Sequence, residues 1–329
     1  MASVSVRLCR DLLRNSARFS FKSPSCFPVG GAVSSAVLPL TPLRCLSESA
    51  PPPAPIRNSD EMKAGSGSAG VVRVATSDNS RSSLNEAELA KFAAISETWW
   101  DSKGPFKPLH LMNPTRVSFI RSMLCRHFRK DPCTKRPLEG LKIIDVGCGG
   151  GILSEPLARL GAYVTGIDAL EKNINVARVH ARFDSVTSSI EYICTTAEQL
   201  VRDKRKFDAV LSLEVIEHVS DPLDFVQSLS DLIAPGGATV ISTINRSIRA
   251  YATAIVAAEY LLNWLPSGTH EWSKFLTPEE LVLILERASI SVKEMAGFVY
   301  DPLSGDWSLS NDTSVNFIAF GAKENAGAI

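Results

Sequence analysis

The sequence predicts an α/β fold in which helices cover both faces of a doubly wound, mostly parallel sheet. Two observations carry this prediction. From Leu141 onward, short β-rich apolar runs alternate with longer amphipathic segments, as is typical of strand–helix–strand units. In addition, residues 143–168 read IIDVGCGGGILSEPLARLGAYVTGID. Alternating glycines follow one apolar run there and an acid ends the next, which is the layout of a nucleotide-binding unit.

The first quarter of the chain is not typical of a globular domain. Residues 1–47 contain six basic residues against one acid, together with nine serines. This composition predicts an organellar transit peptide rather than an ordinary disordered tail. Residues 48–84 contain PPPAP and GSGSAG among many serines and hold too little apolar surface to offset chain entropy, which indicates a disordered linker. The globular domain is therefore expected at residues 85–325.

Charge and cysteine content narrow the classes of partner. The formal net charge of the whole chain is zero, and because residues 1–47 carry an excess of five positive charges, the remainder carries about −5. This balance does not favour binding of a long polyanion, so no nucleic-acid partner is expected. The seven cysteines show no CxxC spacing, which argues against a structural zinc site or a disulfide framework and suits a reducing compartment.

Each expected element follows from a change in the apolar pattern. Large apolar residues recur at about helical period in LNEAELAKFAAISETWW. A second helix is expected to begin after Pro114, in NPTRVSFIRSMLCRHF. We therefore expect a helical preface before the sheet. The expected strands are Lys142–Val146, Tyr163–Ile167, Ile190–Cys194, Phe207–Leu213, Ala238–Thr243 and Val315–Phe320. The other expected helices are Ile152–Leu160, Leu170–Phe183, Pro222–Ile233 and one that follows LTPEEL.

An apolar insert at residues 246–276 interrupts this alternation after the fifth strand. Its most apolar part, residues 250–265, contains Glu259. As a helix this part would span about 24 Å, short of a hydrocarbon core of about 30 Å. A transmembrane helix is therefore not expected. Two interpretations stay open: a buried crossover helix, or a lid over an apolar substrate that also contacts a membrane surface.

The glycine loop is the strongest candidate for a ligand site. Its spacing is GxGxG at Gly147, Gly149 and Gly151, whereas a pyrophosphate usually needs GxGxxG at a helix N-terminus. Asp145, inside the preceding strand, is suitably placed for an ammonium group. Asp168, at the end of the next strand, suits ribose hydroxyls, which a dinucleotide also has. The loop therefore favours a nucleoside ligand without a pyrophosphate over a dinucleotide.

Several motifs together resemble the class I S-adenosylmethionine-dependent methyltransferases: DVGCGGG, Asp168, the pair Ala197–Glu198, SLEVIEHV and APGG. Longer stretches, among them KFAAISETWWD, GPFKPLHLMNPTR and AEYLLNWLPSGTHEWSKFLTPEEL, are similar to the ubiquinone-biosynthesis O-methyltransferases in their mitochondrial form. The resemblance covers about Leu84 to Ala322. It implies a seven-stranded, Rossmann-like methyltransferase sheet with an N-terminal helical preface and an apolar helical insert after the fifth strand.

The resemblance also implies how the methyl donor, S-adenosylmethionine, is bound. Gly147 would lie against its methionyl part, Asp168 would bind the ribose, and Leu213 would line the adenosyl pocket near the turn at Ala197–Glu198. Arg116, in the NPTR motif, would contact the donor, because a guanidinium suits the methionine carboxylate as a bidentate partner. Spacing alone favours a solvated helix position for Arg116.

The stretch after the fourth strand carries the candidate acceptor chemistry. Methyl transfer needs an oxygen nucleophile about 3 Å from the methyl carbon, and a phenol, with a pKa near 10, must lose its proton. Glu214, Glu217 and His218 would share one face if this stretch is helical, and the resemblance implies that they bind a divalent cation, usually taken as Mg²⁺. The residue types alone do not identify the metal. Without a metal, His218 is the best catalytic base, and His270 is a weaker candidate.

The substrates implied by the resemblance are a polyprenylated dihydroxybenzoate and a demethylubiquinol, each with adjacent ring hydroxyls and an isoprenoid tail. We therefore expect peripheral contact with the matrix side of the mitochondrial inner membrane through residues 250–265, which follow Arg246 and Arg249. Association with other ubiquinone-biosynthesis proteins is also expected. The alternatives are a small-molecule C- or N-methyltransferase, a non-catalytic methyltransferase-like scaffold and, less favoured, a nicotinamide oxidoreductase.

Overall fold

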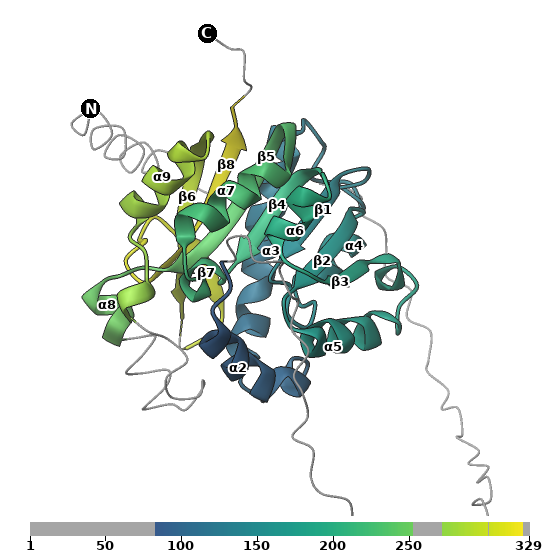
Figure 1. The fold of residues 1–329 in the computed structure, drawn as a ribbon, viewed down its shortest axis with the longest axis horizontal. Coiled ribbons are helices and arrows are strands. Elements are labelled where there is room, and N and C mark those ends of the chain that lie inside the picture. The colour runs from purple at the N-terminus through teal and green to yellow at the C-terminus, as the bar shows by residue number, and fades with distance from the viewer. Residues whose placement is uncertain (1–82, 253–271, 302, 325–329) are drawn as a thin grey trace, which may run out of the picture. The chain divides into compact units, whose positions relative to one another are not determined.

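A computed structural model describes residues 83–252, 272–301 and 303–324. They form an α/β domain around one twisted sheet with the strand order β3-β2-β1-β4-β5-β8-β6-β7 (Figure 1). The parallel strands are β1 (Lys142–Val146), β2 (Tyr163–Asp168), β3 (Glu191–Cys194), β4 (Phe207–Leu213) and β5 (Ile233–Ile244). The antiparallel strands are β6 (Ile290–Tyr300), β7 (Trp307–Ser310) and β8 (Asn316–Lys323). The prediction of a doubly wound, mostly parallel sheet is confirmed.

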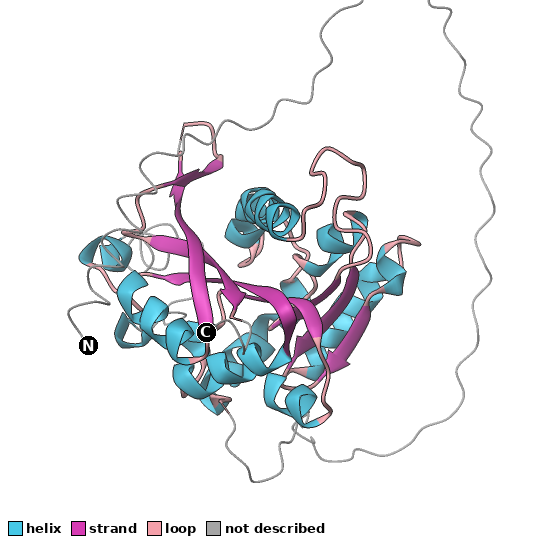
Figure 2. Cartoon of the chain, turned by 90° about the horizontal axis from the view of Figure 1, so that it is seen from above, coloured by secondary structure: helices cyan, strands magenta, loops and turns pink. Residues whose placement is uncertain are grey.

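Helices cover both faces of this sheet (Figure 2). The α-helices are α2 (Glu86–Ile95), α3 (Lys107–His127), α4 (Ser154–Arg159), α5 (Glu171–Ala181), α6 (Ala197–Arg202), α7 (Pro222–Leu232), α8 (Ile248–Ala250) and α9 (Pro278–Arg287). Short 3-10 helices are η2 (Ser96–Thr98), η3 (Thr187–Ser189), η4 (Ile216–His218) and η6 (Trp272–Lys274). The helices α3, α4 and α5 share one apolar core with the sheet, and α6, α7 and α9 share the other.

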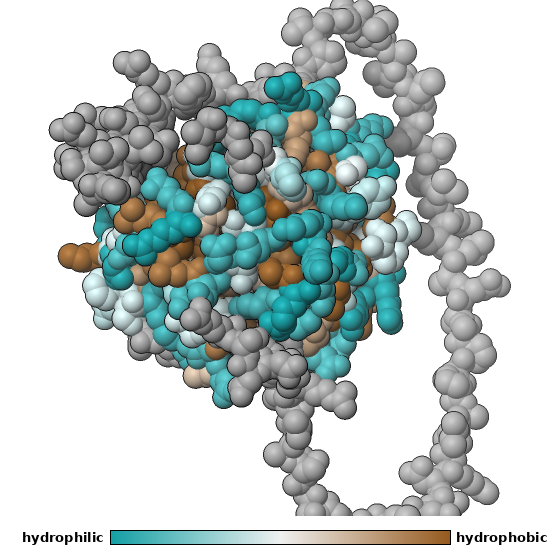
Figure 3. Space-filling view, turned by 45° about the horizontal axis from the view of Figure 1, so that its top comes forward, coloured by the Kyte–Doolittle hydropathy of each residue, from teal (hydrophilic) through white to brown (hydrophobic). Residues whose placement is uncertain are grey.

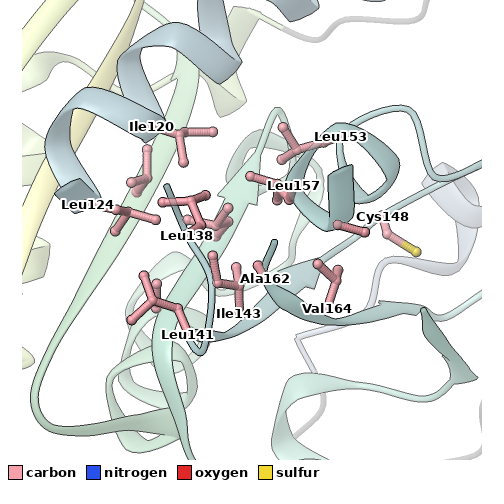
Figure 4. Close-up of a cluster of buried hydrophobic side chains, with 14 of the residues drawn as sticks. Ile120, Leu124, Leu138, Leu141, Ile143, Cys148, Leu153, Leu157, Ala162 and Val164 are labelled. Atoms are coloured by element: carbon pink, nitrogen blue, oxygen red, sulfur yellow. The ribbon is translucent and has the colours of Figure 1, made fainter. Parts of the chain in front are cut away.

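Neighbouring residues on each strand supply the two cores, because successive strand side chains point to opposite faces. Ile143 packs with α3, α4 and α5, and Ile144 packs with α6, α7 and α9. Figure 4 shows part of the first core, where Ile120 and Leu124 of α3 and Leu157 of α4 lie around Ile143. Strands that are apolar on both faces are typical of a parallel sheet covered on both sides.

The strand count is the first correction to the sequence prediction. The described residues contain an eight-stranded sheet rather than a seven-stranded one. The added edge strand is β7, which pairs antiparallel with the end of β6. The two strands are joined by a turn in which Asp301 N donates to Asp306 O at 2.9 Å. β7 is only four residues long and partly exposed, so it lacks the apolar run by which six of the strands were recognised. The bounds of β6 were also not predicted from the sequence.

The start of α3 is the second correction. This helix begins at Lys107, so Pro114 lies inside it rather than before it. Proline removes one helical hydrogen bond, but the buried side chains of Met112 and Phe119 on either side of it pack into the core. That packing keeps the helix continuous through the proline and places Arg116 one half-turn beyond it.

Several predicted segments lie outside the described residues: the transit peptide at 1–47, nearly all of the linker at 48–84, and residues 253–271 of the insert with Glu259 and His270. Within the described part of the chain, no helix is long and apolar enough to cross a membrane. On the face shown in Figure 3, apolar and polar side chains are intermixed.

Candidate active site

A cavity of about 260 Å³ lies where β1, β2 and β4 end, the edge at which open parallel sheets bind ligands. The glycine loop, the loops after β2, β3 and β4, and the preface around α2 form its walls. All of the predicted donor-binding and metal-binding positions line this cavity: Arg116, Gly147, Asp168, Leu213, Glu214, Glu217 and His218. The fold thus gathers residues that are up to 102 positions apart in the sequence.

The glycine loop is shaped by protein side chains packed against it. Gly147 has a φ of 75° and Gly149 a φ of 53°, values that side-chain-bearing residues rarely adopt. A Cβ on Gly147 would lie 2.5 Å from Val215 Cγ2, and one on Gly149 would lie 2.3 Å from Trp99 Cζ2. In the described structure, a valine from the β4 loop packs against Gly147 and a tryptophan from the preface packs against Gly149. Both glycines also line the cavity, and the expected donor contact of Gly147 stays a prediction.

Asp168 is held by donors from two neighbouring loops. Its Oδ2 accepts from Gly149 N at 3.1 Å, and its Oδ1 accepts from Leu170 N at 2.8 Å and Asn173 Nδ2 at 3.2 Å. The Asn173 amide in turn accepts from Trp99 Nε1 at 2.9 Å. Burial raises the pKa of Asp168, and these hydrogen bonds oppose the rise. The carboxylate therefore has a fixed orientation at the end of β2, beside the glycine loop.

Asp145 is a buried acid one strand away from Asp168. Its Oδ2 accepts from Ser154 Oγ at 2.6 Å. Burial raises the pKa of Asp145 to about 6; the Asp168 charge adds to the rise, and the Ser154 hydrogen bond and the nearby Arg116 charge oppose it. A cationic group entering the cavity near Asp145 would favour its ionised form.

Arg116 is buried, with 4% of its surface exposed, so the solvated position favoured by spacing alone is wrong. Its Nη2 lies 3.1 Å from Glu214 Oε1, yet neither Nε nor Nη2 forms a hydrogen bond of acceptable geometry with a described residue. Nε and Nη2 lie along one edge of the planar group, the kind of edge that binds both oxygens of a carboxylate. Although Glu214 supplies a negative charge beside Arg116, the Nε–Nη2 edge still has hydrogen-bonding capacity for a second carboxylate.

Glu214, Glu217 and His218 each have a different partner. Glu214 has a φ of 57°, and its Oε1 accepts from Ser242 Oγ at 2.6 Å. Glu217 Oε2 accepts from Thr243 Oγ1 at 2.9 Å, while its buried Oε1 has no hydrogen-bond partner among the described residues. Burial raises the pKa of Glu217 and the Glu214 charge adds to the rise, whereas the His218 charge opposes it.

The single helical face expected for these three residues is wrong. η4 begins at Ile216, and the left-handed backbone at Glu214 turns that side chain away from the helix toward Arg116. In the described ranges, no group of three His, Cys, Asp or Glu side chains converges in a way that could hold a metal ion. Although Glu217 Oε1 has no partner, the donor set as arranged does not fit a divalent cation, and we derive no chemical step through one.

Sequence reasoning missed Glu88, on α2. Its Oε2 lies 3.0 Å from His218 Nδ1, and its Oε1 accepts from Lys91 Nζ at 3.0 Å and Lys274 Nζ at 3.2 Å. The His218 hydrogen bond is the largest of the causes that lower the pKa of Glu88 to about 2. One signal was available: Glu88 stands in line with Phe92 and Ile95 at helical spacing, so an acid occupied the apolar stripe of the helix.

Comparisons with known proteins identify the family of this chain. A family model described as a methyltransferase domain matches residues 119–292. The chain is 67% identical to the mitochondrial ubiquinone biosynthesis O-methyltransferase of Arabidopsis thaliana, over 75% of this chain and 77% of that protein. It is 50% identical to the ubiquinone biosynthesis O-methyltransferase of Dinoroseobacter shibae, over 71% of this chain and 94% of that protein.

Among solved structures, the magnesium protoporphyrin IX methyltransferase of Synechocystis PCC 6803 with bound SAM matches with a TM-score of 0.49 and 18% identity, over 74% of this chain and 100% of that one. The relatives at 67% and 50% identity are far closer in sequence. In each case the alignment with this chain covers more than two thirds of the relative's length. The chain therefore belongs to the ubiquinone biosynthesis O-methyltransferases, a family of S-adenosylmethionine-dependent methyltransferases.

Proposed function

We propose that this protein transfers the methyl group of S-adenosylmethionine to a ring hydroxyl of polyprenylated phenols in ubiquinone biosynthesis, namely a polyprenyl-dihydroxybenzoate and a demethylubiquinol. One observation carries the proposal beyond family membership. A single cavity is lined both by groups suited to the donor, such as Arg116 and Asp168, and by an imidazole suited to deprotonate an acceptor, His218. Donor and acceptor can therefore meet within one cavity.

The donor end of the cavity matches the charges of S-adenosylmethionine. The open edge of the Arg116 guanidinium would bind the methionine carboxylate, and Asp145 would face the ammonium group. Asp168 would bind the ribose hydroxyls, Leu213 would line the adenosyl part, and Gly147 would contact the methionyl part. The support is that each of these residues lines the cavity and that Nε and Nη2 of Arg116 form no hydrogen bond with a described residue, although Glu214 lies beside Nη2.

At the acceptor end, His218 would act as the general base. In our mechanism the phenolic proton passes to the imidazole while the phenol oxygen attacks the methyl carbon in line with the sulfur. The new O–C bond forms as the C–S bond breaks, and S-adenosylhomocysteine leaves as a neutral thioether. An imidazole is the side chain most often used as a general base in enzymes. The resemblance also implies a divalent cation at Glu214, Glu217 and His218; because the described arrangement does not gather these side chains around one position, this mechanism does not use a cation.

The proposal includes a mitochondrial location, with peripheral contact on the matrix side of the inner membrane. The ends of the insert support it, since Ile248, Tyr251 and Trp272 are 84%, 47% and 42% exposed. The two arginines that precede the expected membrane contact are paired with acids, Arg246 with Glu280 and Arg249 with Asp312. Association with other ubiquinone-biosynthesis proteins rests on the family alone.

Liposome flotation tests the membrane contact. We expect the full chain to float with anionic liposomes and a variant with serine at Ile248, Tyr251 and Trp272 to float less, because apolar side chains anchor peripheral proteins. A variant with serine at Phe183, which is also exposed but is remote in sequence from the insert, is the control. Equal flotation of all three proteins would contradict the proposed surface.

The activity is tested by incubating the full chain with methyl-labelled S-adenosylmethionine and a short-chain prenylated dihydroxybenzoate, with and without a chelator. We expect a labelled methyl ether, identified by NMR of the product. A C-methylated or N-methylated product would overturn the proposed reaction, and donor binding without any product would favour a scaffold. Loss of activity on chelation, restored by Mg²⁺ in wild type but not in Glu217→Ala, would establish the cation and displace His218 as the base.

A further inference from the structure

Two residues one turn apart on α2 hold the imidazole of His218. Glu88 Oε2 lies 3.0 Å from His218 Nδ1, and the Phe92 ring meets the His218 ring edge to face, with centroids 5.0 Å apart and planes at 88°. Residues at i and i+4 share one face of a helix, so α2 presents a hydrogen-bond acceptor and an aromatic contact together. Both contacts cross more than 120 positions of the sequence.

Glu88 is built into this position by charge compensation. Only 3% of the residue is exposed, and burying an unpaired carboxylate would be strongly unfavourable. Besides His218, two ammonium groups approach its other oxygen, from Lys91 on the same helix and from Lys274 in η6. The charged form of Glu88 beside His218 Nδ1 is therefore stabilised by side chains from α2, η4 and η6.

The attachment of α2 does not depend on Glu88 alone. Ser220 N, two residues after His218, donates to Ser83 O at 2.8 Å. Ser83 is itself tied to the α6 side of the cavity, because its hydroxyl donates to Glu198 at 2.5 Å. Removing the Glu88 carboxylate would leave these two contacts in place, so its effect on His218 can be separated from undocking of the helix.

We propose that Glu88 is a positioning residue that fixes the orientation and tautomer of His218; this inference rests on the proposed role of His218 as the base. A neutral imidazole carries its proton on one nitrogen and an acceptor lone pair on the other. A carboxylate at Nδ1 holds the proton on Nδ1 and leaves the lone pair on Nε2, the nitrogen that would take the phenolic proton. The perpendicular Phe92 ring limits rotation of the imidazole.

The experiment compares Glu88→Gln with Glu86→Gln in the full chain, using methyl transfer to the prenylated dihydroxybenzoate. Glu86 lies on the same helix and is exposed, so it is a matched control. We expect Glu88→Gln to lower kcat by roughly 10- to 100-fold, the scale of a misplaced catalytic group, with KM for S-adenosylmethionine changed less than twofold. In ¹⁵N-histidine-labelled protein, the Nδ1–H tautomer signal of His218 should be lost or diminished.

Glu88→Asp keeps the charge but falls one methylene short, and it covers the case in which the amide variant does not fold. Its kcat should fall between those of wild type and Glu88→Gln, with the Nδ1–H signal partly retained. If Glu88→Gln or Glu88→Asp keeps the wild-type kcat while losing that signal, the inference is overturned. If His218→Ala keeps the wild-type kcat, the base itself is wrong. Loss in His218→Ala with no loss in folded Glu88→Gln overturns only the positioning role.

Discussion

The two ends of the cavity are assembled in different ways. At the donor end, Asp145, the glycine loop and Asp168 come from one continuous stretch of 24 residues, and two adjacent parallel strands set their positions. At the acceptor end, His218 stands in a 3-10 helix of three residues. The partners of this stretch come from segments far apart in the chain: Glu88 contacts His218, and Thr243 donates to Glu217.

This difference separates the two functions of the site. Donor binding depends on backbone geometry that the sheet imposes, so it should survive substitutions at the acceptor end. Acceptor chemistry depends on a few side-chain contacts and should be sensitive to single changes there. The preface links the two ends, because Trp99 covers the glycine loop while Glu88 and Phe92, earlier in the same segment, hold His218. The ion pair between Arg116 and Glu214 is a second link.

The sharpest test of this separation is His218→Ala. General-base catalysis contributes about 10²- to 10⁴-fold to rate, so we expect kcat for methyl transfer to fall by about that factor. The dissociation constant for S-adenosylmethionine, measured by calorimetry, should change less than twofold. His127→Ala, a histidine away from the cavity, is the control. A large loss of donor affinity in His218→Ala would show that the two ends are not independent.

Gly149→Ala tests how the preface covers the donor end. The added Cβ would lie 2.3 Å from the Trp99 ring at a φ of 53°. Left-handed strain of about 1 to 2 kcal/mol and overpacking of about 1 to 3 kcal/mol should together lower the free energy of unfolding by about 2 to 5 kcal/mol in urea denaturation. Gly140→Ala has a similar backbone conformation with nothing within 4 Å, so it should show only the strain. Equal losses in both variants would mean that Trp99 does not press on the loop.

Asp168→Asn tests the ribose site. The substitution removes the charge and one acceptor from a carboxylate that already orders Gly149, Leu170 and Asn173. Hydrogen bonds to charged groups contribute about 1.5 to 3 kcal/mol, so the dissociation constant for S-adenosylmethionine should rise roughly 10- to 100-fold. The exposed Asp203→Asn should leave it unchanged. Donor affinity within twofold of wild type would remove Asp168 from the donor site.

The smallest expected effect is the pH dependence of donor binding through Asp145. Its pKa is raised from 3.8 to about 6 in the folded protein, so the carboxyl is largely protonated below pH 6. A donor ammonium prefers the ionised form, and affinity should fall by up to about tenfold per unit as the pH drops through 6. Calorimetry between pH 5 and 8 measures this slope. Asp145→Asn should bind more weakly, with no such slope; an identical slope in the variant would show that another group causes it.

The raised pKa of Asp145 makes the stability of the folded protein without donor depend on pH in the opposite direction to donor affinity. The folded state binds a proton more tightly than the unfolded state, so the Asp145 contribution disfavours folding progressively as the pH rises from about 4 to about 6. Below pH 4 both states are protonated and the contribution vanishes. The donor is therefore expected to stabilise the protein more at pH 7 than at pH 5.

The donor end could be predicted from the sequence because its geometry is local. β1 and β4 match their expected bounds residue for residue, since buried parallel strands are recognisable apolar runs, and the spacing from Gly147 to Asp168 follows from one strand–helix–strand unit. The edge strand β7 and the course of α3 through Pro114 could not be predicted in this way. Both depend on packing between segments distant in the chain.

The acceptor end was predicted by residue type but not by arrangement. Glu214, Glu217 and His218 all reach the cavity, yet helical spacing placed them on one face, while the backbone at Glu214 turns left-handed and Arg116 and Glu88 draw two of the side chains apart. No pattern within residues 214–218 contains that information, because the partners lie on α2 and α3.

The most direct test of the account is how the loss in His218→Ala depends on the acidity of the acceptor. Methyl transfer is measured for wild type and His218→Ala with a series of prenylated phenols whose pKa runs from about 10 down to about 7, at pH 7.5. A general base matters less for a phenol that is already ionised, so the account predicts that the ratio of wild-type to variant kcat shrinks steadily toward one along the series. A ratio that stays constant across all acceptors would show that His218 supports the structure of the site without removing the proton, and would contradict the account.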